Sequence, residues 1–182
     1  MTENQSRKVL EFWFEELEPA QWWQVNEEVD QLIRDRFTEL HNQACRCELF
    51  GWRQTPQGRL AEIIVLDQFS RNIYRNKPDA FAADPLALAL AQEAIVQGAD
   101  AQLEEHQKGF IYLPFMHSES LIVHEEAEQL YRKLGNQNNL DFELRHKVII
   151  EQFGRYPHRN EILNRESTEQ EIEFLKQPGS SF

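Results

Sequence analysis

Two pairs of opposite charges stand inside the most apolar stretches of the chain. Asp67 and Arg71 form one pair and Glu151 and Arg155 the other, and each acidic residue directly follows at least three aliphatic residues. The members of a pair are four residues apart, so on a helix they lie on one face within reach of each other. Charge is costly in apolar surroundings unless it is paired. Residues that carry such a cost are candidates for binding or catalysis.

Both pairs belong to a nine-residue segment that the chain contains twice. Residues 63–71 read IIVLDQFSR and residues 147–155 read KVIIEQFGR, with an offset of 84 positions (151 − 67). Such an echo is typical of architectures that duplicate a unit and bury a shared face. Two interpretations stay open. The pairs fasten the helix ends to the following loops, or Arg71 and Arg155 converge on a bound anion.

Polar residues near the two copies complete a candidate anion site. They are Gln68, Asn72, Gln152, His158, Arg159 and Asn160, with His117 and Glu119 from the segment YLPFMHSE at 112–119. His117 would bind an anion beside the free amides of a helix start, unless Ser118 only caps that helix. In an enzyme, Asp67 or His158 would move a proton while Arg71 and Arg155 stabilise negative charge.

Helices must position these residues, because apolar side chains recur at spacings of three and four along the whole chain. The pattern predicts an all-α fold of about eight helices in stacked antiparallel hairpins, with the two echoing segments as central elements. Asp84 before Pro85 predicts a helix start, Pro114 an interruption, and residues 136–139 a loop. The expected helices span 5–17, 26–48, 58–73, 84–98, a short stretch from 101, 118–134, 140–153 and 167–176.

Length and charge restrict the classes of protein. The 182 residues suit one domain, 1–182, in which we expect the polar N-terminal residues and the tail 178–182 to be mobile. The chain has 19 Lys and Arg against 31 Asp and Glu, a formal charge of −12, which repels nucleic acid and anionic membranes. Without an apolar leader or an 18-residue apolar stretch, we expect a cytoplasmic protein. We expect no metal or cofactor.

Four segments together resemble a known bacterial family. They are Trp22-Trp23, LDQFSRN at 66–72, YLPFMHSE at 112–119 and GRYPHRN at 154–160. This family is catalogued as domain of unknown function nine-two-four, and the resemblance spans nearly the whole chain. It implies a tetratricopeptide-repeat-like helical fold and no established activity. The family's characteristic residues would fall at Asp67, Gln68, Arg71, Asn72, His117, Glu119, Gln152, Gly154, Arg155, Pro157, His158, Arg159 and Asn160.

Two functions of different class follow from these residues. The first is a binding module in which Arg71, His117, Arg155 and His158 line a pocket for a small anionic molecule or the acidic end of a peptide. The alternative is a hydrolase or transferase that uses Asp67 or His158 for proton transfer.

Overall fold

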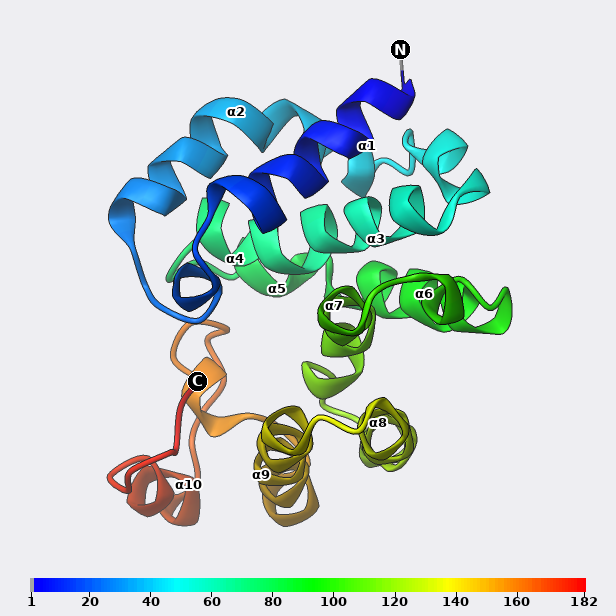
Figure 1. Cartoon of the computed structure of the whole chain (residues 1–182). Coiled ribbons are helices and arrows are strands. Elements are labelled where there is room, and N and C mark those ends of the chain that lie inside the picture. Colours follow the sequence, from blue (N-terminus) through cyan, green and yellow to red (C-terminus); the bar gives the residue numbers. More distant parts are fainter. Residues whose placement is uncertain (1) are drawn as a thin grey trace. The chain divides into compact units, whose positions relative to one another are not determined.

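The computed structural model describes residues 2–182, in which helices and turns occur without any strand (Figure 1). This confirms the predicted all-α fold. The α-helices are α1 (Thr2–Glu11), α2 (Glu27–Cys45), α3 (Pro56–Ile64), α4 (Ser70–Ile73), α5 (Asp79–Ala82), α6 (Asp84–Val96), α7 (Glu105–Met116), α8 (Leu121–Leu134), α9 (Gln137–Phe153) and α10 (Glu169–Phe174). Among the described residues, no helix combines the length and the apolar character needed to cross a membrane.

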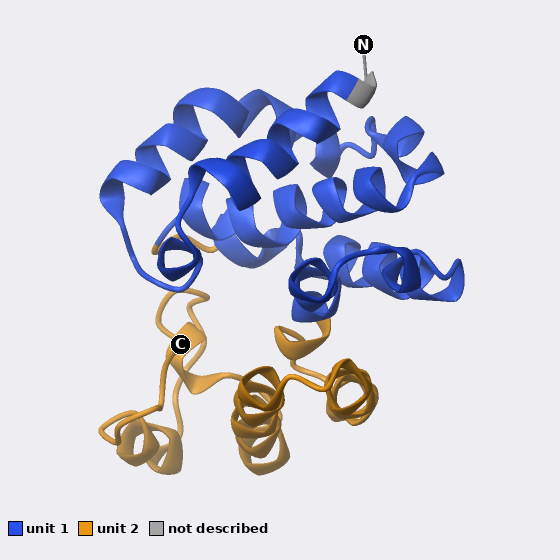
Figure 2. Cartoon of the chain, viewed as in Figure 1, with its two compact units in different colours: residues 1–75, 79–114 blue, residues 76–78, 115–182 orange. Residues whose placement is uncertain are grey.

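The chain groups into two compact units, coloured separately in Figure 2. Unit 1 comprises residues 1–75 and 79–114, and unit 2 comprises residues 76–78 and 115–182. The first copy of the repeated segment therefore lies in unit 1 and the second in unit 2. The single domain that the sequence suggests stays a prediction.

In unit 1 the first copy lies in a long helical segment, which we call the first rod. Thr55 caps it, its Oγ1 accepting from the Gly58 N–H at 3.0 Å, and Pro56 occupies the first turn. The rod continues from α3 through a π-helical turn, η4 (Val65–Phe69), into α4. Every residue from 60 to 70 is buried, as expected of a central helix without a polar face.

In unit 2 the second copy ends a helical hairpin. Helices α8 and α9 pack against each other and are joined through Gly135, which adopts a left-handed φ of 80°. Asn136 then caps α9, its Oδ1 accepting from the Asn139 N–H at 3.2 Å. The predicted loop at 136–139 is wrong for this reason, because three of its four residues belong to the helix. Gly154, at φ 67°, ends α9 as predicted.

Two other predicted boundaries are wrong, and a third is right although the predicted cap is absent. Pro114 lies inside α7, where the buried run 110–116 keeps the chain helical despite the lost backbone donor. Helix α6 begins at Asp84 as predicted, but Asp84 does not cap it, because its carboxylate binds Arg71. Ser118 does not cap α8, which begins only at Leu121; its hydroxyl instead accepts from the N–H of Ser120 at 3.2 Å.

The tail that we expected to be mobile makes defined contacts within unit 2. Ser180 is buried and its hydroxyl donates to the carbonyl oxygen of Leu175 at 3.1 Å. The ring of Phe182 stacks on His146. Two side chains of the tail are thus part of the packed structure.

Gly58 offers a test of how tightly the first rod begins. A Cβ at this position would collide with the backbone carbonyl oxygen of Trp52, whereas a Cβ at Gly51 would meet nothing within 4 Å. We expect Gly58→Ala to lower the free energy of unfolding by about 1–3 kcal/mol through overpacking. Gly51→Ala should change it by less than about 0.5 kcal/mol. Urea denaturation of both variants checks this, and equal stabilities would contradict it.

Candidate functional site

The guanidinium of Arg71 binds a carboxylate that the sequence did not predict. Its two Nη atoms donate to the two oxygens of Asp84 at 2.9 and 3.1 Å, and Nη1 also donates to the backbone oxygen of Asp67 at 2.7 Å. The predicted pair with the Asp67 carboxylate is present, but at 3.5 Å it is long. Arg71 therefore fastens the start of α6 to the end of the first rod.

The amides of the first motif also have partners within unit 1. Gln68 donates from Nε2 to Asp67 Oδ2 at 2.5 Å, and Asp67 is only 1% exposed. Asn72 donates to Asp30 Oδ1 at 2.8 Å, and the Arg75 guanidinium forms a two-pronged pair with the same carboxylate. Burial alone would raise the pKa of Asp30, but the bonds from Arg75 and Asn72 hold it below its usual value.

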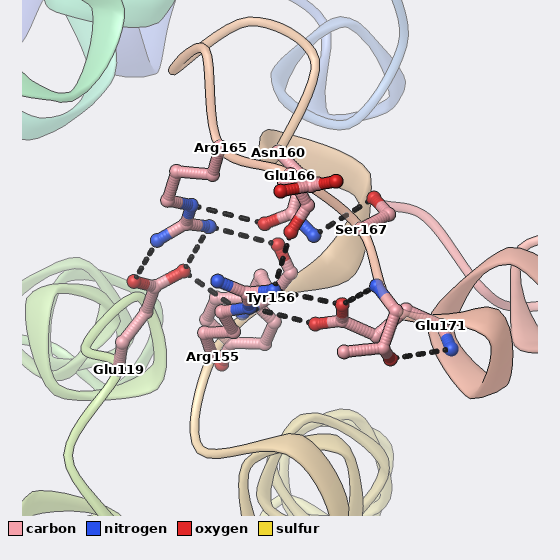
Figure 3. A network of polar contacts seen from close by, with 9 residues as sticks. Glu119, Arg155, Tyr156, Asn160, Arg165, Glu166, Ser167 and Glu171 are labelled. Carbon is pink, nitrogen blue, oxygen red and sulfur yellow. Dashed lines mark hydrogen bonds and ion pairs between the residues drawn. The ribbon is translucent and has the colours of Figure 1, made fainter.

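In unit 2, Arg155 binds forward in the chain, as Figure 3 shows. Its Nε and Nη2 donate to the two oxygens of Glu171 at 2.7 and 2.8 Å, and Nη2 also donates to the Glu166 carbonyl oxygen at 2.8 Å. The predicted pair with Glu151 is wrong. Gly154 ends α9 in a left-handed turn, so Arg155 is no longer on the helix face of Glu151, which stays exposed.

Glu119 and Asn160 are linked through Arg165, which the sequence analysis missed (Figure 3). Arg165 donates to both oxygens of Glu119 at 2.6 and 2.9 Å and to Asn160 Oδ1 at 2.9 Å. The Tyr156 N–H donates to Glu119 at 2.8 Å. Burial would raise the pKa of Glu119, but these bonds and the charges of Arg165 and Arg159 hold it below its usual value. Glu119 thus fastens the turn after α9.

One signal in the sequence pointed to part of this network. Thr168 and Glu171 stand in the spacing of a capping box, and in the structure each side chain accepts from the other's backbone N–H. A capping box predicts where a helix starts, but it does not predict a bond to an arginine elsewhere in the chain. The pairing of Glu171 with Arg155 follows only from the fold.

Imidazole rings gather around Tyr156 in unit 2. Tyr156 is fully buried, its hydroxyl donates to the Met116 carbonyl oxygen at 2.5 Å, and its ring centroid lies 5.6 to 6.3 Å from those of three histidines. These are His124, His146 and His158. Arg159 lies over the Tyr156 ring, with Cζ 4.6 Å from the centroid. We call His117, His124, His146 and His158 the imidazole cluster.

His146 is the neutral centre of the imidazole cluster. Burial lowers its pKa to about 3, against its Nδ1 hydrogen bond to the Phe142 carbonyl oxygen at 2.7 Å. The charges of His117, His124 and His158 lower this pKa further, so these three rings lie within electrostatic range of His146. Because Nδ1 carries the proton, Nε2 keeps its lone pair. The ring of Phe182 stacks on His146 with centroids 3.7 Å apart.

His124 and Glu143 form a buried polar pair between α8 and α9. Both are 0% exposed, and His124 Nδ1 lies 2.7 Å from Glu143 Oε1, while Nε2 donates to the Ser118 carbonyl oxygen at 2.9 Å. Burial raises the pKa of Glu143, and its Oε2 has no hydrogen-bond partner among residues 2–182. Both observations favour a proton shared between the two side chains over a bare carboxylate.

The predicted site residues thus divide between the two units. Asp67, Gln68, Arg71 and Asn72 lie in unit 1, and the other seven lie in unit 2. Arg159 is buried, His117 and His158 are half-buried, and Gln152 is exposed. In the described part of the chain, no group of three or more His, Cys, Asp and Glu side chains is placed to hold a metal ion.

The fold and these contacts define an all-helical protein whose turns are fastened by arginine–carboxylate pairs. The chain belongs to the bacterial proteins of unknown function named DUF924, whose family model matches residues 9–179. This confirms the resemblance seen in the four sequence segments. A solved structure of a protein of unknown function from Agrobacterium tumefaciens is similar, with 37% identity and a TM-score of 0.92 over 97% of this chain and 99% of that one. No curated protein matches the chain.

Acid should weaken the contact between Arg155 and Glu171. The hydrogen bonds from Arg155 lower the pKa of Glu171 to about 2, against the opposing effect of burial, from an ordinary value of 4.5. The folded-state pKa is the lower one, so the stabilisation is complete above pH 4.5 and is lost as the pH falls towards 2. We expect Glu171→Gln to be less stable than the wild type at pH 7, with the difference shrinking towards pH 3.

Urea denaturation from pH 3 to 7 measures this difference. Glu173→Gln is the matched control, because Glu173 is an exposed residue of the same helix. A constant gap between Glu171→Gln and the wild type over this range would refute the assignment.

The buried pair of His124 and Glu143 gives a second stability test. Glu143→Ala leaves His124 Nδ1 without its partner and opens a cavity, so we expect a loss of about 3–5 kcal/mol. Glu143→Gln keeps the volume and a hydrogen bond and should cost about 1 kcal/mol. Glu151→Ala, on the exposed side of α9, should cost less than about 0.5 kcal/mol. If Ala and Gln at position 143 cost the same in urea denaturation, the hydrogen bond contributes nothing.

Proposed function

We propose that this protein is a helical binding module that holds a small anionic molecule, or the acidic end of a peptide, at the imidazole cluster of unit 2. The observation that carries the proposal is the gathering of three of the six histidines around Tyr156, with His117 within electrostatic range of His146, in a chain of net charge −12. Basic side chains concentrated against an acidic background suit a ligand of negative charge.

The motif arginines, Arg71 and Arg155, are not the groups that we expect to bind the anion. Arg71 and Arg155 each face a carboxylate through two hydrogen bonds, so most of their charge is balanced inside the protein. An external anion would have to displace Asp84 or Glu171 to bind them. The imidazoles of His117 and His158 in unit 2 are half-buried, and an anion that approached them would favour their protonated forms.

Proton uptake gives the proposed binding a pH dependence of known sign. A bound anion favours the charged form of a neighbouring imidazole and raises its pKa. Affinity should therefore increase as the pH falls through about 6.5, the ordinary range of histidine. His146 does not take part, because burial keeps its pKa near 3.

Calorimetric titration with inorganic phosphate and with succinate at pH 6 and pH 8 tests the proposal. We expect affinity at pH 6 to exceed that at pH 8 by about tenfold and His158→Gln to remove most of this difference. His106→Gln is the control, because His106 is an exposed histidine of unit 1. Binding that is unaffected by His158→Gln, or no binding of either anion, would reject the site.

The alternative reading, a hydrolase or transferase with Asp67 or His158 as acid–base group, stays a prediction. So do the repeat-like stacking of the hairpins and the cytoplasmic location. An anion that binds at pH 6 would also supply the compound class on which activity assays begin.

A further inference from the structure

We propose a second binding site, in unit 1, at which Trp22 and Trp23 hold a small quaternary ammonium ion. The exposed indole of Trp23 carries the proposal. It is 62% exposed, yet its ring lies parallel to that of Phe110, with centroids 5.7 Å apart and an interplanar angle of 9°. Phe110 is only 3% exposed. One face of the Trp23 indole thus packs on buried Phe110, and the other face is exposed to solvent.

A second indole stands at a right angle to the first. The Trp22 ring is inclined at 87° to that of Trp23, with centroids 6.3 Å apart, and at 88° to that of Phe110. Its Nε1–H donates to the Trp13 carbonyl oxygen at 2.7 Å, which fixes its orientation. Phe14 packs edge to face against both Trp22 and Phe110. The two indoles therefore form a corner that is held in place before any ligand arrives.

This arrangement differs from scattered surface hydrophobicity. A single exposed apolar side chain is common on proteins and needs no explanation. Trp23 instead packs on a buried aromatic cluster and extends it to the surface. It directly follows a short 3₁₀ helix, η2 (Pro19–Trp22). Rigid aromatic surface of this kind favours binding, because little side-chain freedom is lost when a ligand settles on it.

The charged residues that neighbour the corner in the sequence favour a cation. Residues 9–33, which include Phe14 and both tryptophans, contain no Lys or Arg, and residues 78–107, which lead up to Phe110, contain none either. Carboxylates are frequent in the same stretches, among them Glu15, Glu18, Glu104 and Glu105. The faces of aromatic rings carry a negative potential, so a cation is attracted by the rings and by the carboxylates alike.

Three basic residues near the corner, in space or in sequence, leave this preference intact. The His106 ring packs edge to face on Phe14 with centroids 5.2 Å apart, and its Nδ1 lies 3.5 Å from Glu104 Oε2. Arg36 lies over Phe12 and Phe37, and its charge is balanced by a two-pronged pair with Glu16 at 2.6 and 2.9 Å. Lys108 is two residues from Phe110 on α7, a spacing at which side chains of a helix point in different directions. An alkylated ammonium ion fits better than a compact metal ion, because its methyl groups pack on indole while its charge faces the ring.

A titration with choline and its neutral isostere tests the proposal. The probe is observed through the indole N–H signals in NMR spectra of the full chain, where Trp52, buried elsewhere in unit 1, is an internal reference. We expect saturable shifts of Trp22 and Trp23 with choline. 3,3-Dimethylbutan-1-ol has the same shape without the charge and should bind about fivefold more weakly or worse. Equal binding of the two compounds, or no saturable shift, would overturn the proposal.

Two variants separate the corner from the general surface. Trp23→Leu keeps an apolar cover over Phe110 but removes the indole, and it should abolish saturable choline binding in calorimetry. Phe50→Leu removes another aromatic ring of unit 1, which is 70% exposed on η3 (Phe50–Gln54), and should leave binding unchanged. Thermal melting of both variants would check that they are folded. Choline binding that survives Trp23→Leu, or a trimethyllysine peptide that binds where choline does not, would overturn the assignment.

Discussion

Buried carboxylates need a positive charge beside them. In both units, arginines that supply this charge hold the loops in place. Five carboxylates that are buried or half-buried each receive two hydrogen bonds from one guanidinium: Asp30, Glu62, Asp84, Glu119 and Glu171, held by Arg75, Arg53, Arg71, Arg165 and Arg155. A planar fork that meets a planar carboxylate fixes direction as well as distance. Removing either partner would leave the other charge desolvated, so each pair locks the turn that carries it.

Arginine–carboxylate pairs of this kind occur at the end of each copy of the repeated segment and just beyond it. In each copy the motif arginine reaches forward to the start of a later helix, from Arg71 to Asp84 and from Arg155 to Glu171. A second arginine beyond each copy reaches back to an acidic residue earlier in the chain. The copies still differ in their backbones, because the first contains a π-helical turn and the second is α-helical up to Gly154. The two copies thus share the way in which the chain is fastened and differ in local helix geometry.

This use of arginine decides which side chains are left for a ligand. Guanidinium groups that are paired with carboxylates inside the protein hold the turns in fixed positions. The side chains that we propose for ligand binding are of other kinds. They are the imidazoles around the buried Tyr156 in unit 2 and the two indoles of the corner in unit 1. In the two sites that we propose, an imidazole would take up a proton when an anion approaches, and the indoles would offer a negative ring face to a cation. Two ligand types of opposite charge are then compatible with one strongly acidic chain.

The sequence by itself determined the helical class, the buried rod at 60–70, the end of α9 at Gly154 and the family. Each of these depends on local periodicity, on residue conformation or on motifs that stand together in the chain. Only the tertiary structure decided the partners of Arg71 and Arg155 and the meeting of the histidines. An arginine reaches any carboxylate that the fold brings within a few ångströms, and helical spacing predicts only neighbours on the same uninterrupted helix. Glycine ended that helix one residue before Arg155, and the guanidinium turned to Glu171.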